Sequence, residues 1–263
     1  MTRARLPATP APFPERLPWT ARLLGVALRP RGYEVRRRTP PPRMAQERAA
    51  FAATSAAIRV RHAAQTREIV AALRRTYERP VLGRVETWTL IERLARCIDP
   101  TDGALGCSSQ LVHVLQVADA MEADGVNDPD LLVAALVHDL GKLLLLEGEM
   151  PENVVCMNGP IGDHAPEIGL DRVLLQWNHD EAAYMRLVGH VPEPVAWLVR
   201  YHSILLDDCA PLMDARDRTY AARYLTPFRH YDQDSKSPWK VPRRPLDHYR
   251  DLLETRLPRT LLF

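Results

Sequence analysis

The sequence has little of what marks secreted or membrane-spanning proteins. Its 263 residues include only four cysteines, and none of these shows C-x-x-C spacing. A disulfide scaffold needs a higher cysteine density, so a reducing cytoplasm is the expected location. No apolar run approaches the roughly 20 residues needed to cross a bilayer. We therefore expect a cytoplasmic protein that has no membrane partner.

An excess of charge of either sign is also lacking. The formal net charge is only +2, so composition indicates no nucleic-acid partner. The chain is 46% hydrophobic and 26% charged, as in ordinary globular proteins. Its length permits one large domain or two small ones with a substantial core.

Residues 1–45 differ from the rest of the chain because they are rich in Pro and Arg and poor in acids. Proline removes backbone donors and disfavours helix, so we predict an extended or disordered tail. An Arg-rich, acid-poor start also resembles an organelle transit peptide, and composition leaves that alternative open. We place the folded domain at residues 46–263.

From Met44 onward the sequence is helical in character. Apolar residues recur at steps of three and four, and no stretch alternates with period two for long. We predict helices over 44–79, 87–98, 108–123, 171–187 and 193–206. A further helix begins at Pro129 with Asp128 as its N-cap and stops at Gly141. The expected fold is an all-α, compact, single-domain helical bundle.

The stretch LVAALVHDLGK carries the first chemical signal. Its apolar run delivers His138 and Asp139 side by side, and imidazole and carboxylate are both ligands for iron, zinc and related metals. Four of the nine histidines lie in the predicted helices, namely His113, His138, His179 and His202. One histidine on such a face is usually an ordinary core residue. Four on successive helices indicate a metal centre, because packed helices can project ligands inward.

A carboxylate is expected to complete a histidine-rich iron site. The segment FRHYDQDSKSPW offers Asp232 and Asp234, with Lys236 close behind. Spacing alone does not choose between the two acids, and either could be a solvated loop residue.

The ordered set of motifs resembles the myo-inositol oxygenase family. The matching text is HVLQVADAM, LLVAALVHDLGKLLLLEGE, GLDRVLLQWNHDE, AWLVRYHS and YDQDSK, and it covers roughly residues 60–263 in the family's order. The resemblance implies a helical fold of the HD-domain type that holds two irons, mixed-valent Fe(II)/Fe(III) in the active state. It also implies O2-dependent cleavage of a cyclitol ring to a uronic acid, with a small polyol as substrate and a monomeric enzyme.

The same resemblance assigns the site residues. The first iron would be held by His113, His138, Asp139 and Asp232. The second would share Asp139 and be completed by His179 and His202. Catalytic and substrate-binding roles would fall to Lys142 and Lys236, and further substrate contacts to Asp99, Ser203 and, where the match is poorest, Arg43.

Two alternatives and one departure bear on the substrate. The motif HDLGK also occurs in HD-domain metal-dependent phosphohydrolases, and two cations near a site would suit a phosphate. A non-catalytic scaffold would show a broken ligand set, whereas all six ligand positions are intact.

The loop after the His-Asp pair is shorter than in the family, and Cys156-Met157 replace a Gly-Asp pair there. A thioether is a weak hydrogen-bond acceptor, so recognition of a polyol should differ at this point.

Overall fold

The computed structural model describes residues 42–263, with side chains from residue 46 onward. Most of the predicted tail therefore lies outside the described residues. The first described helix begins at Pro42, inside the predicted tail and four residues before the expected start of the folded domain. No helix in the described range is long and apolar enough to span a membrane.

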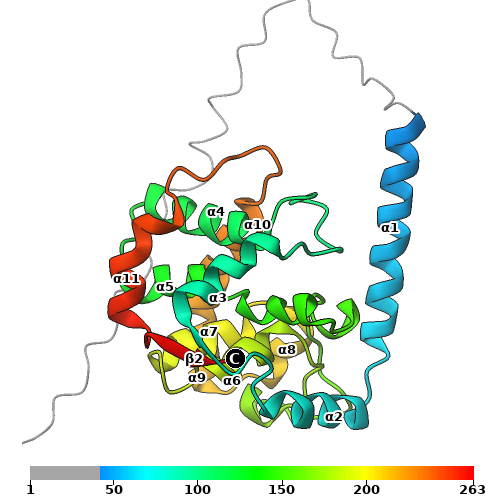
Figure 1. Cartoon of the computed structure of the whole chain (residues 1–263). Coiled ribbons are helices and arrows are strands. Elements are labelled where there is room, and N and C mark those ends of the chain that lie inside the picture. Colours follow the sequence, from blue (N-terminus) through cyan, green and yellow to red (C-terminus); the bar gives the residue numbers. More distant parts are fainter. Residues whose placement is uncertain (1–41) are drawn as a thin grey trace, which may run out of the picture.

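The all-α prediction is confirmed (Figure 1). The α-helices are α1 (Pro42–Ala63), α2 (Arg67–Glu78), α3 (Thr87–Arg93), α4 (Gln110–Ala123), α5 (Pro129–Val137), α6 (His179–Leu187), α7 (Glu193–Tyr201), α8 (Leu206–Cys209), α9 (Ala215–Tyr220), α10 (Thr226–Asp234) and α11 (Arg250–Arg256). Shorter 3₁₀ and π segments are Leu94–Arg96, Leu140–Glu147, Pro151–Asn153, Leu170–Arg172, Ala210–Leu212, Ala221–Leu225 and Leu246–Tyr249. Two three-residue strands that the sequence did not predict, β1 (Arg84–Glu86) and β2 (Thr260–Leu262), pair antiparallel.

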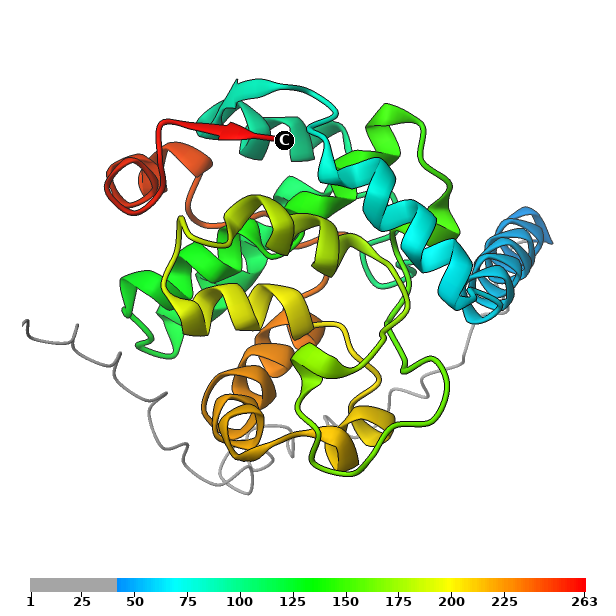
Figure 2. The same ribbon diagram turned by 90° about the horizontal axis from the view of Figure 1, so that it is seen from below.

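Helix α5 lies at the centre of the fold. Every residue from Leu131 to Val137 is buried. Helices α4, α7 and α11 all contact it, and α1 and α11 lie at opposite sides of the molecule (Figure 1). Seen from below, α4 and α5 run beside α6 and α7 (Figure 2). A helix that is apolar all round is stable only where neighbours cover every face. Its C-terminal end therefore delivers His138 and Asp139 into the interior.

The start of α5 follows the prediction, but its end does not. The Asp128 side chain accepts hydrogen bonds from the backbone N–H groups of Asp130 and Leu131, and Pro129 is the first helical residue. Gly141 is not the stop. The chain leaves α geometry after Val137 and continues as a 3₁₀ segment to Gly148, whose positive φ of 89° ends it. Only glycine adopts that conformation readily.

Other predicted helices are also shorter than expected. The helix over 87–98 leaves α geometry after Arg93. The helix over 44–79 is interrupted after Ala63, and the Thr66 side chain caps the start of α2. The helix over 171–187 is wrong in its first half, where a 3₁₀ turn and extended chain precede α6. The helix over 193–206 ends at Tyr201. The last three errors run through Gln65, Asn178 and Ser203, whose side chains make tertiary hydrogen bonds.

The end of α1 fixes the loop that follows the 3₁₀ segment. One ring nitrogen of His62 lies 2.7 Å from the carbonyl of Glu152, and the other lies 3.0 Å from that of Met157. The Gln65 amide donates to the Trp177 carbonyl and accepts from the Trp177 N–H. The loop carrying Cys156-Met157 is therefore held in one conformation beside α6.

Candidate metal centre

Four buried histidines converge from four helices, three of them at helix ends. His113 lies within α4, His138 directly follows α5, His179 begins α6 and His202 directly follows α7. A helix end lets a side chain reach past the packed helix faces into the space between them. The structure thus brings together all four histidines that the sequence analysis selected.

Asp139 lies between two pairs of histidines, His113–His138 and His179–His202. Its Oδ2 is 3.5 Å from Nε2 of both His113 and His138. Its Oδ1 is 3.1 Å from Nε2 of His179 and 3.7 Å from Nε2 of His202. Each group of three offers ligand atoms close enough to share one metal ion. One carboxylate therefore presents a different oxygen to each histidine pair.

Backbone carbonyls orient three of these rings. The Nδ1 atoms of His138, His179 and His202 lie 3.0, 2.6 and 2.9 Å from the carbonyl oxygens of Ala135, Val154 and Val199. An Nδ1–H donor there leaves the Nε2 lone pair facing the centre, the usual arrangement of metal-binding histidines.

The Nε2 atoms also face one another within each pair. They are 3.3 Å apart in His113–His138 and 3.2 Å apart in His179–His202. Two lone pairs at that distance repel unless a cation or a proton lies between them. The residues present therefore fit a bound metal at each pair.

The geometry distinguishes Asp232 from Asp234. Asp232 is buried, and its Oδ1 lies 2.9 Å from Nε2 of His113. Burial alone would raise the pKa of Asp232, but the Lys236 ammonium and the neighbouring imidazoles hold it well below its usual range. Asp234 is exposed and pairs with His230 at 2.5 Å. Only Asp232 joins the cluster.

Lys142 is buried directly beside the shared carboxylate. Its Nζ lies 3.1 Å from Asp139 Oδ2, 3.1 Å from Asp99 Oδ2 and 3.2 Å from Gln110 Oε1. Burial opposes its charge, but the two carboxylates raise its pKa well above the ordinary value. Lys142 therefore donates hydrogen bonds to Asp139 and Gln110 and forms an ion pair with Asp99.

Lys236 joins a second acid that the sequence analysis missed. Its Nζ lies 3.0 Å from Asp102 Oδ2 and 3.7 Å from Asp232 Oδ1. Asp102 also accepts from the backbone N–H groups of Ala104 and Leu105. The available signal was its position in the same short turn, CIDPTD, as Asp99.

Asp180 is the other acid that was missed. Its Oδ1 lies 3.1 Å from Nε2 of His179, and its carboxylate accepts the Ser203 hydroxyl at 2.8 Å. Burial would lower the pKa of His202, but Asp180 and Asp139 together raise it to about 9. The signal was a second adjacent His-Asp pair in QWNHDE. Ser203 is thus placed beside the His179–His202 pair, as the sequence analysis expected.

The structure does not test the prediction for Arg43, and it places Cys156-Met157 in the loop before α6. The backbone of Arg43 lies near the start of α1, and its side chain is outside the described residues. Met157 is 40% exposed, and its carbonyl faces His62. Cys156 is buried, and its carbonyl accepts from the Asn178 amide.

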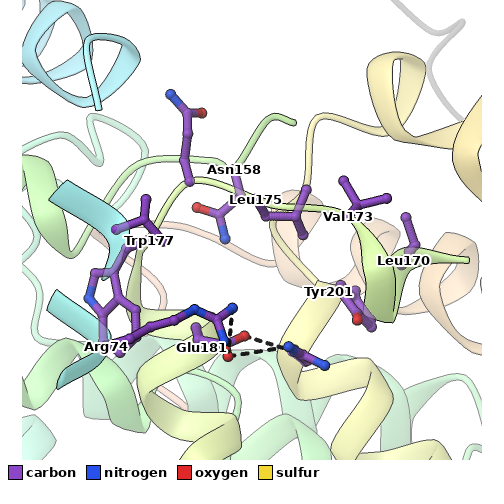
Figure 3. A pocket seen from close by; sticks show the side chains of 11 residues that line it. Arg74, Asn158, Leu170, Val173, Leu175, Trp177, Glu181 and Tyr201 are labelled. Carbon is purple, nitrogen blue, oxygen red and sulfur yellow. Dashed lines mark hydrogen bonds and ion pairs between the residues drawn. The ribbon is translucent and has the colours of Figure 1, made fainter. Parts of the chain in front are cut away.

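A cavity lined in part by Glu181 of α6 and Tyr201 of α7 is too small for a cyclitol (Figure 3). Its volume is about 10 Å³, enough for about one water molecule. Glu181 lies in its wall between the guanidinium groups of Arg74 and Arg200 (Figure 3). The cavity therefore belongs to the support of α6 and α7.

The fold and the cluster define an all-α protein with a buried histidine–carboxylate centre that can hold metal. A sequence model of the myo-inositol oxygenase family matches residues 52–162 and 152–263. The chain belongs to the myo-inositol oxygenase family, so the resemblance seen in the sequence is confirmed.

Curated relatives agree with that assignment. Inositol oxygenase 1 of Arabidopsis thaliana is 30% identical over 224 residues, covering 70% of this chain and 71% of that protein. A probable inositol oxygenase of Oryza sativa subsp. japonica is 29% identical over 245 residues, covering 77% and 78%. Inositol oxygenase of Homo sapiens is 27% identical over 124 residues, covering 35% and 44%.

Proposed function

We propose that this protein is a non-haem di-iron oxygenase that cleaves the ring of a cyclitol with O2. For myo-inositol the balanced reaction is one cyclitol plus one O2 giving one glucuronate, one proton and one water. Membership of the family supports the reaction type. The observation that carries the site is Asp139, whose two carboxylate oxygens face two separate histidine pairs.

The donor set suits two irons held in an HD-type helical site. His113, His138, Asp139 and Asp232 would hold the first, and Asp139, His179 and His202 the second. Imidazole and carboxylate donors without thiolate suit redox iron. When bound as an Fe(II)/Fe(III) pair, the irons would supply a Lewis acid for the alcohol and electrons for O2.

The two lysines of the site have different surroundings and therefore different tasks. Lys142 would fix the orientation of Asp139, because it donates to that carboxylate and is itself held by Gln110 and by an ion pair with Asp99. Lys236 has acceptors on Asp102 and Asp232, and its Nζ is 3.7 Å from the latter. An ammonium held there would orient a substrate hydroxyl and stabilise an oxyanion as it forms.

The positions of Asp99 and Ser203 support the substrate contacts proposed for them. Asp99 and Ser203 lie on opposite sides of Asp139, beside Lys142 and the His179–His202 pair respectively. Arg43 would add a further substrate contact, as the family resemblance implies. The substrate class is a cyclitol or a related polyol, of which myo-inositol is one member. We also infer a monomer acting in the cytoplasm on this small polyol, with no nucleic-acid partner.

Oxygen uptake and product analysis test the proposed function. Iron-loaded protein should consume one O2 and release one uronate for each molecule of myo-inositol or of a related cyclitol. Release of phosphate from nucleotides or phosphomonoesters under anaerobic conditions, with no O2 uptake on any cyclitol, would instead support the phosphohydrolase.

A further inference from the structure

Gln110 places a buried amide nitrogen beside the metal centre. The side chain is fully buried, and its Nε2 has no hydrogen-bond partner among residues 42–263. Gln110 is the first residue of α4, three before His113, and its backbone N–H donates to the Cys97 carbonyl at 2.8 Å. A buried amide with two unused donors costs free energy. Such a group marks a place where a ligand can bind.

The orientation of this amide is fixed by Lys142. Gln110 Oε1 accepts from Lys142 Nζ at 3.2 Å. An ammonium cannot accept a hydrogen bond, so the reversed amide would place Nε2 against a cation. The carbonyl end therefore stays on Lys142, and the donor end is the one left for a ligand.

Lys142 is already engaged with protein groups. Its Nζ donates hydrogen bonds to Asp139 and Gln110 and forms an ion pair with Asp99 at 3.1 Å. Of these three side chains, that of Gln110 carries N–H donors, and its Nε2 is unpaired among the described residues.

We propose that Gln110 is a substrate-binding residue whose Nε2 donates a hydrogen bond to one hydroxyl oxygen of the bound cyclitol. This deepens the proposed function and rests on it. The amide lies one hydrogen bond from Lys142, which in turn contacts the carboxylate shared by both histidine pairs. A donor in such a site discriminates against an analogue that lacks the matching hydroxyl, because the donor is then left unpaired.

Two substitutions separate the donor from the acceptor. Gln110→Met has a similar length and removes both polar atoms. Gln110→Glu keeps an oxygen for Lys142 and replaces the NH2 group with a carboxylate oxygen, which removes the donor and adds a negative charge. Each variant and the wild type are loaded with iron, and their iron content is measured. Binding of myo-inositol and of the deoxy-inositols, each lacking one hydroxyl, is then measured by anaerobic calorimetry, and KM and kcat are measured in air.

Both variants should keep their iron and bind myo-inositol roughly tenfold or more weakly, the usual effect of losing one buried hydrogen bond. For the one deoxy-inositol that lacks the recognised hydroxyl, wild type and variants should bind equally. An equal loss for every deoxy-inositol would overturn the proposal and leave Gln110 a structural or water-binding residue. Unchanged binding in both variants would overturn it too.

The design also separates this proposal from the proposed function. Wild-type protein that binds cyclitols with the expected Gln110 dependence but consumes no O2 would contradict the oxygenase and not the subsite. Normal turnover by Gln110→Met would contradict the subsite and not the oxygenase. Wild-type protein that binds no cyclitol would contradict both.

Discussion

Asp139 owes its bridging position to its backbone. It follows His138, the first residue after α5, and its own φ and ψ are −94° and 8°, outside the helical region. Active-site residues are often found in this sparsely populated conformation. The adjacent His138 still has helical angles, so the two side chains point in different directions. One dipeptide can therefore supply a terminal ligand to one histidine pair and a shared ligand to both.

Replacement of Asp232 and of Asp234 by Ala gives a matched pair. Asp232→Ala should lower bound iron from two to one per chain and abolish uronate formation, because His113 and His138 lose their second carboxylate. Asp234→Ala should keep both irons and most of the activity, because this side chain is exposed and pairs with His230. Iron analysis of the two purified variants checks this. Equal iron content in both would contradict the place of Asp232 in the centre.

At the level of residues, the sequence was sufficient for the histidines and not for every acid. Four histidines among large apolar neighbours, one fused to Asp139, indicated a shared centre before any geometry. Spacing alone could not separate Asp232 from Asp234, because both lie near the same helix end. The family resemblance selected Asp232, and the structure buries it while leaving Asp234 exposed. Asp102 and Asp180 were missed because their partners, Lys236 and Ser203, come from distant segments.

Helix ends are the elements that build this site, and Gly141 is what allows two of them to meet. A Cβ atom on Gly141 would lie 2.0 Å from the carbonyl oxygen of His179, the first residue of α6. No real Cβ contact is that short, so α6 could not stay in place. The close approach of the 3₁₀ segment to α6 therefore positions Asp139 against His179.

Gly141→Ala should move or unfold α6. We expect a loss of more than about 3 kcal/mol in the free energy of unfolding, since backbone atoms rather than a flexible side chain obstruct the Cβ. Iron at the His179–His202 pair should be lost as well. Gly148→Ala is the control, because that site is open and only its positive φ is unfavourable, at roughly 1–2 kcal/mol. Urea denaturation and iron analysis compare the two, and equal effects would contradict the role of Gly141.

The elements with local signals were predictable, and those set by tertiary contacts were not. Asp128 and Pro129 act at the start of α5 as their chemistry predicts. The sequence predicts that α5 continues past Val137, because the residues there are apolar at helical spacing. What tightens the 3₁₀ segment there is the packing of Gly141 on the backbone of α6, which no local pattern shows.

Across the whole molecule, Asp171 ties segments that are far apart in sequence. It accepts from Arg200 Nη1 at 2.7 Å, from the Tyr201 hydroxyl at 2.8 Å and from Arg216 Nη2 at 2.5 Å. Burial would raise the pKa of Asp171, but Arg216, Tyr201 and Arg200 lower it below the ordinary value. These contacts join the turn before α6 to helices α7 and α9.

The depressed pKa of Asp171 gives a stability effect of known sign. A carboxyl whose pKa is lower in the folded state contributes stability above its unfolded pKa of about 4 and loses it as pH falls through the folded pKa. Asp171→Asn should therefore lower the urea midpoint at pH 7. Its difference from wild type should shrink as pH falls below about 4. A difference independent of pH would contradict an ionic role for Asp171.

The central claim is that Asp139 is shared by two irons, and iron counting with electron paramagnetic resonance tests it most directly. Partly oxidised wild-type protein should hold two irons per chain and give a coupled half-spin signal that changes when a cyclitol is added. Asp139→Asn, which keeps the size of the side chain, should lose the coupled signal and at least one iron while circular dichroism shows the same helix content. Retention of two coupled irons in that variant would contradict the account.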